Sequence, residues 1–367
     1  MTSPIRILLQ TTIPPTANDW SIARFGKLAA LLREQRHPDG RPQFDVVARD
    51  REALGRADPV LSRLDRSSFD ELWLFAVDEG DGLTAEDSDG ITRFREAGRG
   101  LMVTRDHMDL GCSICQLGGV GKAHHFHSHN LDPDESRRRS DDPYTTHISW
   151  PNFHSGANGD FQAIAAVGSL HPVLQDPSSP SGAIRYLPCH PHEGAVDAPG
   201  DEPARVIARG RSKVTGAHFN LAVAFEASEG GGRAIAESTF HHFVDYNWDT
   251  RLGCPSFVDE PTGSGMQTEP QALRDTHRYA VNIAEWLAGA RRARPPAPRR
   301  RALFRDRVRR AIELAPVGAV GVVIGRGAYD GLAVGGDRKI GMMRAGHRDP
   351  RYERPVGTDH GEASASI

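Results

Sequence analysis

Short runs of β-branched and leucine residues alternate with helical patterns over the first hundred residues. The strand-like runs are 5–10, 44–48, 71–77 and 100–105. Apolar residues recur at helical spacing in 22–32 and again in 91–97, and the capping-box pair Thr84 and Asp87 precedes the second helix. This order of elements predicts an α/β domain with a mostly parallel sheet.

The pattern weakens in the middle of the chain and returns later. From about 108 to 160 the sequence predicts a long irregular insertion, which we interpret as a functional segment or a lid with an aromatic wall. Short strand-like runs follow at 183–187, 204–208, 221–225 and 233–237. A final amphipathic helix is predicted over 270–288, because Tyr279, Ile283 and Trp286 share one face.

The composition changes abruptly at Arg291, where the run RRARPPAPRRRALFRDRVRR begins. We therefore predict an α/β domain over 1–290 and an Arg/Pro-rich linker with a C-terminal extension over 291–367. The charge block is typical of a solvated linker. Contact with nucleic acid or acidic lipid through these arginines is the alternative, and truncation near Ala290 is expected to leave a folded domain.

Composition and charge argue against several classes of protein. The chain has 367 residues and a formal net charge of -3, so it has no global attraction to nucleic acid or to anionic membranes. Four cysteines are too few for a disulfide scaffold. The first residues lack a signal-peptide pattern, and no stretch approaches the roughly 20 apolar residues of a membrane span. We expect a cytoplasmic protein without a membrane span.

Candidate chemistry begins where the strand 100–105 ends. Asp106 and His107 follow this strand, at the edge where open α/β sheets bind ligands. The pair Cys112 and Cys115 has zinc-knuckle or redox spacing, but a second C-x-x-C is missing. A buried helical turn with both thiols packed is therefore the alternative for this pair.

A histidine-rich stretch follows within the same insertion. In an extended segment His125, His127 and His129 point to one face and His124 to the other. Alternate histidines of this kind bind Zn²⁺ or Fe²⁺ when another segment supplies a further ligand. A solvated loop is the other interpretation.

Two later segments carry histidines of similar interest. His190, His192 and Glu193 lie within four residues and are candidate metal ligands, or a base with its orienting partner; a polar loop is the alternative. His241 and His242 follow the strand 233–237. We expect one of this pair in the core and the other in the cleft.

Asp245 and Asn247 follow closely and are placed to orient the cleft histidine. No Gly-rich phosphate loop follows the first strand, where Thr11, Thr12 and Ile13 stand instead. We therefore expect no nucleotide cofactor.

Further signals are the order of the strands, the GRG before Leu101, the run 169–173 (SLHPV) and the run 231–249 (GGRAIAESTFHHFVDYNWD). In these features the chain resembles the class I glutamine amidotransferase-like superfamily, nearest its trehalose-utilisation (ThuA-like) branch. The resemblance covers about 5–288 and implies a flavodoxin-like, doubly wound fold. It also implies a link to sugar metabolism, because that is the loose association of the ThuA-like branch.

The resemblance breaks down at the catalytic residues of the amidotransferases. Those enzymes use a Cys-His-Glu triad, whereas Asp106 and His107 occupy the turn where the cysteine would lie. His241 follows the late strand, but no Pro-Glu follows it. We do not expect a functional glutamine amidotransferase.

The leading hypothesis is an enzyme that uses acid-base or metal-assisted hydrolysis on a small polar substrate, with a sugar derivative implied by the resemblance. The candidate catalytic residues are Asp106, His107, His190, His192, Glu193, His241 and His242. The candidate ligands for Zn or Fe are His125, His127, His190, His192 and His241. A non-catalytic domain that binds a small ligand or a protein is the alternative, favoured by the missing cysteine.

Overall fold

The computed structural model of the chain describes residues 3–142 and 144–292. The predicted linker and C-terminal extension beyond Arg292 lie outside the described residues. Within the described ranges, no helix combines the length and the apolar character needed to cross a membrane. The cytoplasmic location stays a prediction.

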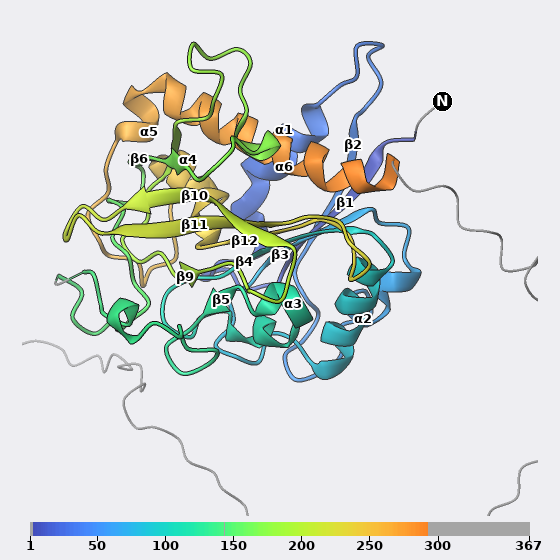
Figure 1. Cartoon of the computed structure of the whole chain (residues 1–367), viewed down its shortest axis with the longest axis horizontal. Helices are drawn as coiled ribbons and strands as arrows, with labels where there is room; N and C mark the ends of the chain where they lie inside the picture. Colours follow the sequence, from blue (N-terminus) through green and yellow to red (C-terminus); the bar gives the residue numbers. More distant parts are fainter. Residues whose placement is uncertain (1–2, 143, 293–367) are drawn as a thin grey trace, which may run out of the picture. The chain divides into compact units, whose positions relative to one another are not determined.

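A central sheet of eight strands forms the middle layer of the described domain (Figure 1). The strands in spatial order are β2 (Phe44–Arg49), β1 (Ile5–Thr11), β3 (Glu71–Phe75), β4 (Gly100–Thr104), β12 (Ala234–Glu237), β11 (His218–Phe225), β10 (Ala204–Arg211) and β7 (Ala165–Ala166). Two small sheets pair β5 (His124–His125) with β9 (Ala195–Val196) and β6 (Phe161–Ala163) with β8 (Tyr186–Pro188).

The strand order confirms the predicted flavodoxin-like class. The first five strands in space, β2, β1, β3, β4 and β12, are parallel. Numbered among themselves in chain order, these five strands follow the 2-1-3-4-5 order of a flavodoxin-like sheet. The strands β11, β10 and β7 then extend the sheet in antiparallel fashion. The predicted run 183–187 is mostly irregular and contributes only to β8, which begins at Tyr186.

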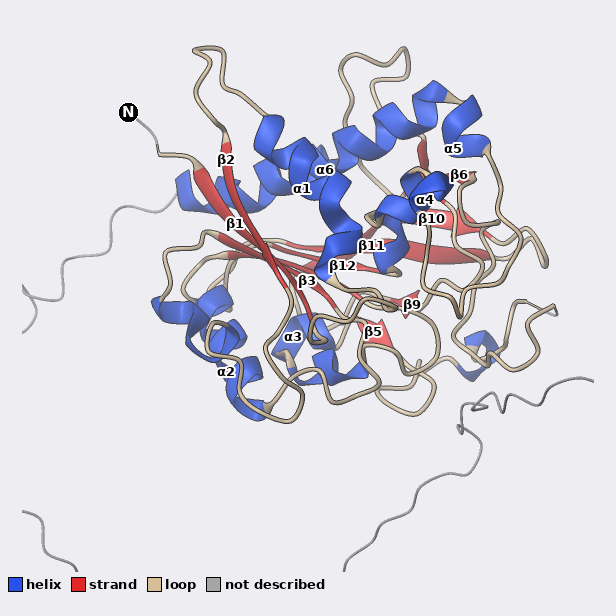
Figure 2. Cartoon of the chain, turned by 180° about the vertical axis from the view of Figure 1, so that it is seen from behind, coloured by secondary structure: helices blue, strands red, loops and turns tan. Residues whose placement is uncertain are grey.

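Helices cover both faces of the sheet, as Figures 1 and 2 show from opposite sides. The helices α1 (Gly26–Glu34) and α6 (Pro270–Arg292) lie on one face, and α2 (Ala85–Glu96) and α3 (Gly118–Gly121) lie on the other. The short helices α4 (Asp245–Trp248) and α5 (Gly265–Thr268) complete the set.

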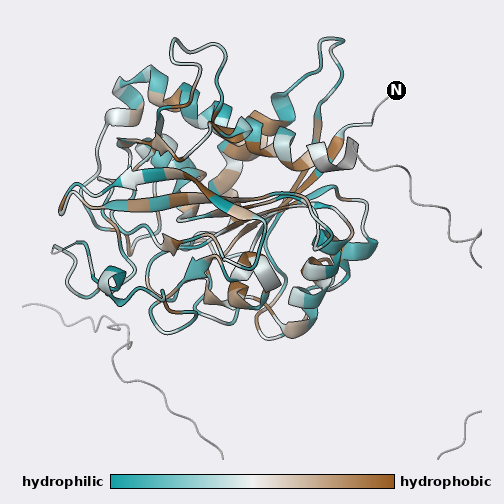
Figure 3. Cartoon of the chain, in the orientation of Figure 1, coloured by the Kyte–Doolittle hydropathy of each residue, from teal (hydrophilic) through white to brown (hydrophobic). Residues whose placement is uncertain are grey.

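The two helical layers bury separate cores against the sheet. Phe25, Leu28 and Ile283 belong to the core on the α1 and α6 face, whereas Ile91 and Phe94 of α2 belong to the core on the other face. Figure 3 shows this division as brown strands and inward-facing helix surfaces with hydrophilic residues outside. Burial of both sheet faces explains why the parallel strands read as continuous apolar runs in the sequence.

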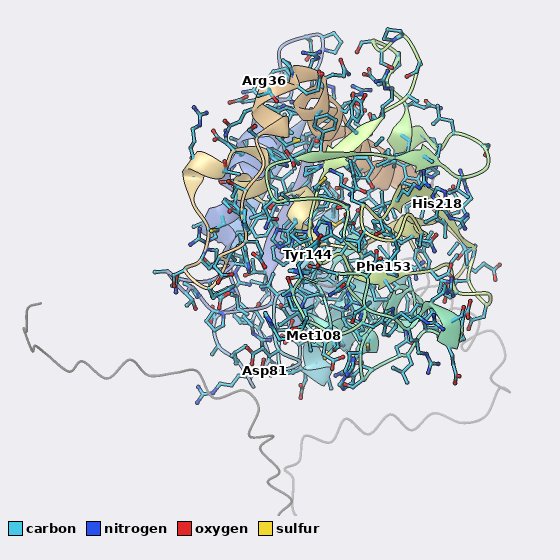
Figure 4. All side chains as sticks on the ribbon, turned by 90° about the vertical axis from the view of Figure 1, so that its left-hand side faces the viewer. Arg36, Asp81, Met108, Tyr144, Phe153 and His218 are labelled. Atoms are coloured by element: carbon cyan, nitrogen blue, oxygen red, sulfur yellow. The ribbon has the colours of Figure 1, made fainter. Side chains whose placement is uncertain are left out.

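The insertion between β4 and β6 is irregular over most of its length, as predicted. Its residues Met108, Tyr144 and Phe153 are labelled in Figure 4. Tyr144 is 85% exposed, so it does not form an inward-facing aromatic wall. Cys112 is buried and Cys115 half-buried in a short 3-10 helix, Cys112–Gln116. Burial raises the pKa of Cys112 to about 12 and that of Cys115 to about 11, which suits packed rather than reactive thiols.

Candidate metal centre

Two neighbouring parallel strands bring Asp106 and His241 together. Asp106 lies two residues after the end of β4, and His241 lies on a 3-10 helix, Phe240–His242, shortly after β12. Because β4 and β12 are paired in parallel, their carboxyl ends lie at the same edge of the sheet. The Phe240 N–H donates to the Arg105 carbonyl at 2.9 Å, which joins the two turns, and the His241 N–H donates to the Thr239 hydroxyl at 3.1 Å.

A third segment reaches this edge from the loop between β8 and β9. The backbone N–H of His190 donates to the Ser155 hydroxyl at 2.9 Å, and that hydroxyl donates to the His190 carbonyl at 3.0 Å. Gly194 then packs against the β4 turn. A Cβ at this position would lie 2.3 Å from Arg105 Nε and 2.7 Å from the Asp106 carbonyl oxygen, so the close approach requires glycine.

These three segments form a compact cluster of Asp106, His190 and His241. One potential ligand atom of each lies within 4.8 Å of the other two, and among the described residues no other His, Cys, Asp or Glu group does this. His190 Nε2 lies 3.2 Å from Asp106 Oδ1. The rings of His190 and His241 stack with centroids 3.5 Å apart and planes 9° from parallel.

The cluster is buried and its histidines are held neutral. Asp106, His190 and His241 are 4%, 5% and 2% exposed. Burial lowers the pKa of both imidazoles well below the ordinary value, and the neighbouring His107 and His192 lower the pKa of His190 further. Neutral imidazole is the form of histidine that binds metal ions.

The other ring nitrogens of the two histidines contact asparagine side chains. His190 Nδ1 lies 3.1 Å from Asn158 Oδ1, and His241 Nδ1 lies 2.8 Å from Asn247 Oδ1. The sequence identified Asn247 as an orienting residue. Asp245 acts elsewhere, because its carboxylate accepts the backbone N–H groups of Gly26 and Lys27 at the start of α1. Asn158 was not predicted as a site residue. It lies in the irregular insertion, where no helical or strand period indicates which way a side chain points.

His107 and His192 border the cluster. Their ring centroids lie 5.4 Å apart, and His192 lies 5.5 Å from His190. His107 Nε2 is 3.9 Å from Asp106 Oδ2, and the His107 side chain is 20% exposed, so this side of the cluster approaches solvent. Burial lowers the pKa of both His107 and His192.

His192 is held between two carboxylates that sequence reasoning missed. Its Nε2 lies 3.2 Å from Asp142 Oδ2 and its Nδ1 lies 3.8 Å from Glu260 Oε1. Both acids lie in irregular segments, where nothing in their spacing pointed toward a histidine. Ring contacts link four of the predicted residues at this edge of the sheet: His107, His190, His192 and His241.

Glu193 and His242 belong instead to a separate buried network. His242 Nδ1 lies 3.0 Å from Glu237 Oε2, and its Nε2 lies 3.5 Å from Glu193 Oε2. Burial acts to lower the pKa of His242, but the two carboxylates outweigh it and raise this pKa to about 9. Glu193 also accepts hydrogen bonds from Ser238 and Gln162. His241 lies in the cluster and His242 in this network, and both are buried, so neither side chain faces an open cleft.

The structure does not bring His125 and His127 into the cluster. His125 Nδ1 contacts the Asn130 carbonyl at 2.9 Å, and His127 Nδ1 contacts the Trp150 carbonyl at 3.0 Å. The third member of the cluster is Asp106, which the sequence suggested as a catalytic residue, and it offers a potential ligand atom. The sequence pattern indicated which of these histidines share a face of the segment. It could not indicate whether that face points toward the cluster.

No protein-family model matches this chain, and no curated protein matches it. Solved structures with a similar arrangement include the mmIFT52 N-terminal domain, at 10% identity and a TM-score of 0.44, covering 77% of this chain and 97% of that one. They also include a putative ThuA-like protein from Bacteroides uniformis, at 11% identity and a TM-score of 0.37, with coverages of 78% and 93%.

A third similar structure is the glutaminase domain of the CTPS of Trypanosoma brucei with bound acivicin. It shares 13% identity at a TM-score of 0.36, and the coverages are 76% and 94%. All three TM-scores lie below 0.5, so none of these similarities supports a conclusion about this chain.

Proposed function

We propose that this protein is a metal-dependent enzyme that hydrolyses a small polar substrate, with the metal held by Asp106, His190 and His241. The observation that carries the proposal is the buried meeting of two neutral imidazoles and one carboxylate within 4.8 Å. Two histidines and a carboxylate form a common ligand set of catalytic Zn²⁺ and Fe²⁺ sites. Such a set leaves coordination positions open for water or substrate.

The spacing of the ligand atoms suits a metal ion. Ligands about 2.0–2.1 Å from a tetrahedral ion lie roughly 3.3 Å from one another. The separation of 3.2 Å between His190 Nε2 and Asp106 Oδ1 is close to that value. A bound ion would also interact favourably with the charge of the buried Asp106 carboxylate.

The residues around the cluster supply the rest of the chemistry. When bound, a divalent ion acts as a Lewis acid that activates water or polarises a substrate carbonyl. His107 borders the side of the cluster that approaches solvent, and it provides a proton acceptor there. His192 packs beside it, and its Nε2 contacts Asp142 Oδ2 at 3.2 Å, which orients the ring.

Elemental analysis of untagged protein and of matched variants tests the metal part of the proposal. We expect about one equivalent of Zn or Fe in the wild type, and less than a tenth of that in Asp106→Asn and His241→Gln. The control is His127→Gln, which removes a predicted ligand outside the cluster and should keep the metal. Retention of metal by both cluster variants, or its loss only in the control, would contradict the proposed ligand set.

A screen of small neutral esters, amides and glycosides tests the catalytic part. Turnover should require the metal, and removal of the ion with a chelator should abolish it until Zn²⁺ or Fe²⁺ is restored. Stoichiometric metal with no turnover of any substrate class would instead favour a binding domain. Thermal unfolding of each variant shows whether a loss reflects chemistry or the fold.

A further inference from the structure

We infer that Asn158 and Asn247 act as a pair of positioning residues that fix the tautomers of His190 and His241. Both rings then carry the lone pair on Nε2, and the Nε2 of His190 faces Asp106. The purpose of this arrangement rests on the proposed metal site. The tautomers themselves are a property of the protein alone and can be measured without any metal.

The first step starts from a backbone carbonyl. The side-chain amide of Asn247 approaches the Cys189 carbonyl oxygen at 2.7 Å. A carbonyl oxygen only accepts hydrogen bonds, so the Asn247 atom that faces it is the NH₂ group. The other amide atom, Oδ1, therefore lies 2.8 Å from His241 Nδ1. Because Oδ1 is an acceptor, His241 must carry its proton on Nδ1.

The second step passes through the other hydrogen of the same NH₂ group. Asn247 Nδ2 donates to Asn158 Oδ1 at 2.9 Å, which fixes the orientation of the Asn158 amide. Asn158 Oδ1 also lies 3.1 Å from His190 Nδ1. This oxygen accepts both contacts, so His190 too must carry its proton on Nδ1. Both asparagines are buried, and bulk water does not compete for these bonds.

The consequence appears on the opposite side of the rings. With one proton on each ring, held on Nδ1, the two Nε2 atoms carry lone pairs. His190 Nε2 then faces Asp106 Oδ1 at 3.2 Å as one acceptor facing another. A cation between the two atoms, either a metal ion or a second ring proton, relieves this contact. Metal-binding histidines commonly have this arrangement, in which the ring N–H donates to an oxygen behind the ring.

The Asn158 side chain offers a sharp test, because its Nδ2 is buried and has no hydrogen-bond partner. Asn158→Asp keeps the accepting oxygen, loses this idle donor and adds a carboxylate charge beside His190. Asn158→Leu keeps the volume and removes the acceptor. If the residue served packing alone, Leu would replace it better than Asp; if it fixes the His190 tautomer, Asp would replace it and Leu would not.

The experiment uses the full chain labelled with ¹⁵N-histidine and freed of metal by a chelator. Long-range ¹H–¹⁵N spectra report which ring nitrogen carries the proton, and His190→Gln and His241→Gln assign the signals. We expect both rings to be protonated on Nδ1 in the wild type and in Asn158→Asp. In Asn158→Leu, His190 should populate the Nε2-protonated form. A wild-type spectrum with Nε2 protonated in either ring would overturn the inference.

Cobalt titration then links the tautomers to the metal. Co²⁺ affinity should fall about 10- to 100-fold in Asn158→Leu and stay near the wild type in Asn158→Asp. The control Asn282→Leu alters a buried asparagine that bonds the Val173 and Gln175 carbonyls, and it should change neither tautomer nor affinity. Unchanged tautomers and affinity in Asn158→Leu would also overturn the inference. The inferred tautomers without any Co²⁺ binding would uphold it and refute the proposed metal function instead.

Discussion

His171 and His242 are both buried histidines, yet their surroundings shift their pKa values in opposite directions. Burial lowers the pKa of His171 to about 4, and the nearby Arg205 and Arg233 add to this shift. The carboxylates around His242 raise its pKa to about 9. At neutral pH the fold therefore holds one imidazole neutral and the other charged, and each residue stabilises the protein over a different pH range.

His171 should make the protein less stable in mild acid. Its unfolded imidazole binds a proton below about pH 6.5, whereas the folded one remains neutral until about pH 4. The free energy of unfolding should therefore fall by about 1–2 kcal/mol between pH 7 and 5 through this residue. Glu226 Oε1 lies 3.7 Å from His171 Nε2, but that carboxylate is half exposed.

The variant His171→Asn isolates this contribution. His171 Nδ1 accepts the Val173 N–H at 3.2 Å, and an asparagine oxygen can accept the same bond without titrating. Urea unfolding at several pH values should show a shallower loss of stability in the variant than in the wild type. Equal slopes for the two proteins between pH 7 and 5 would contradict the assignment.

At the scale of elements, the local sequence pattern was sufficient to predict features that depend only on residues close together in the chain. The predicted capping box at the start of α2 is present, with Asp87 N–H donating to the Thr84 hydroxyl at 3.3 Å and Thr84 N–H donating to Asp87 Oδ2 at 3.1 Å. The sequence could not show that Asp87 also pairs with the buried Arg51 at 3.2 Å. Arg51 and Asp87 lie far apart in the chain, and no sequence pattern links the two positions.

This difference predicts unequal costs for two substitutions in one cap. Thr84→Ala removes a single capping bond and should lower the free energy of unfolding by about 1 kcal/mol. Asp87→Ala also leaves the Arg51 charge buried without its carboxylate and should cost about 3–5 kcal/mol. Equilibrium unfolding in urea compares the two, and equal costs would show that the Arg51 contact contributes little.

At the scale of the whole molecule, the order of the longer strands and helices was predictable because each of them carries its own period. The two-residue strand β7 of the central sheet was not predicted, because so short an element has no period. The site was only partly predictable. The predicted metal ligands included His190 and His241, which lie in the cluster, but also His125, His127 and His192, which do not. Which histidines converge depends on loop paths and on close approaches such as that of Gly194, and neither leaves a periodic signal.

The domain boundary gives a prediction at the same scale. Both core clusters are made of residues no later than Ala288, and α6 ends at Arg292. A chain truncated after Arg292 should therefore unfold in one cooperative transition, with a midpoint within a few degrees of that of the full chain. Calorimetry of the two proteins tests this. A broad, non-cooperative transition in the shorter chain would show that the extension completes the core.

Anomalous diffraction at the zinc edge, from crystals of the untagged protein loaded with Zn²⁺, tests the proposed metal centre most directly. We predict one strong peak about 2.0–2.2 Å from His190 Nε2, His241 Nε2 and a carboxylate oxygen of Asp106. Absence of a peak among these three side chains, or a peak at His125 and His127 instead, would contradict the proposed metal centre.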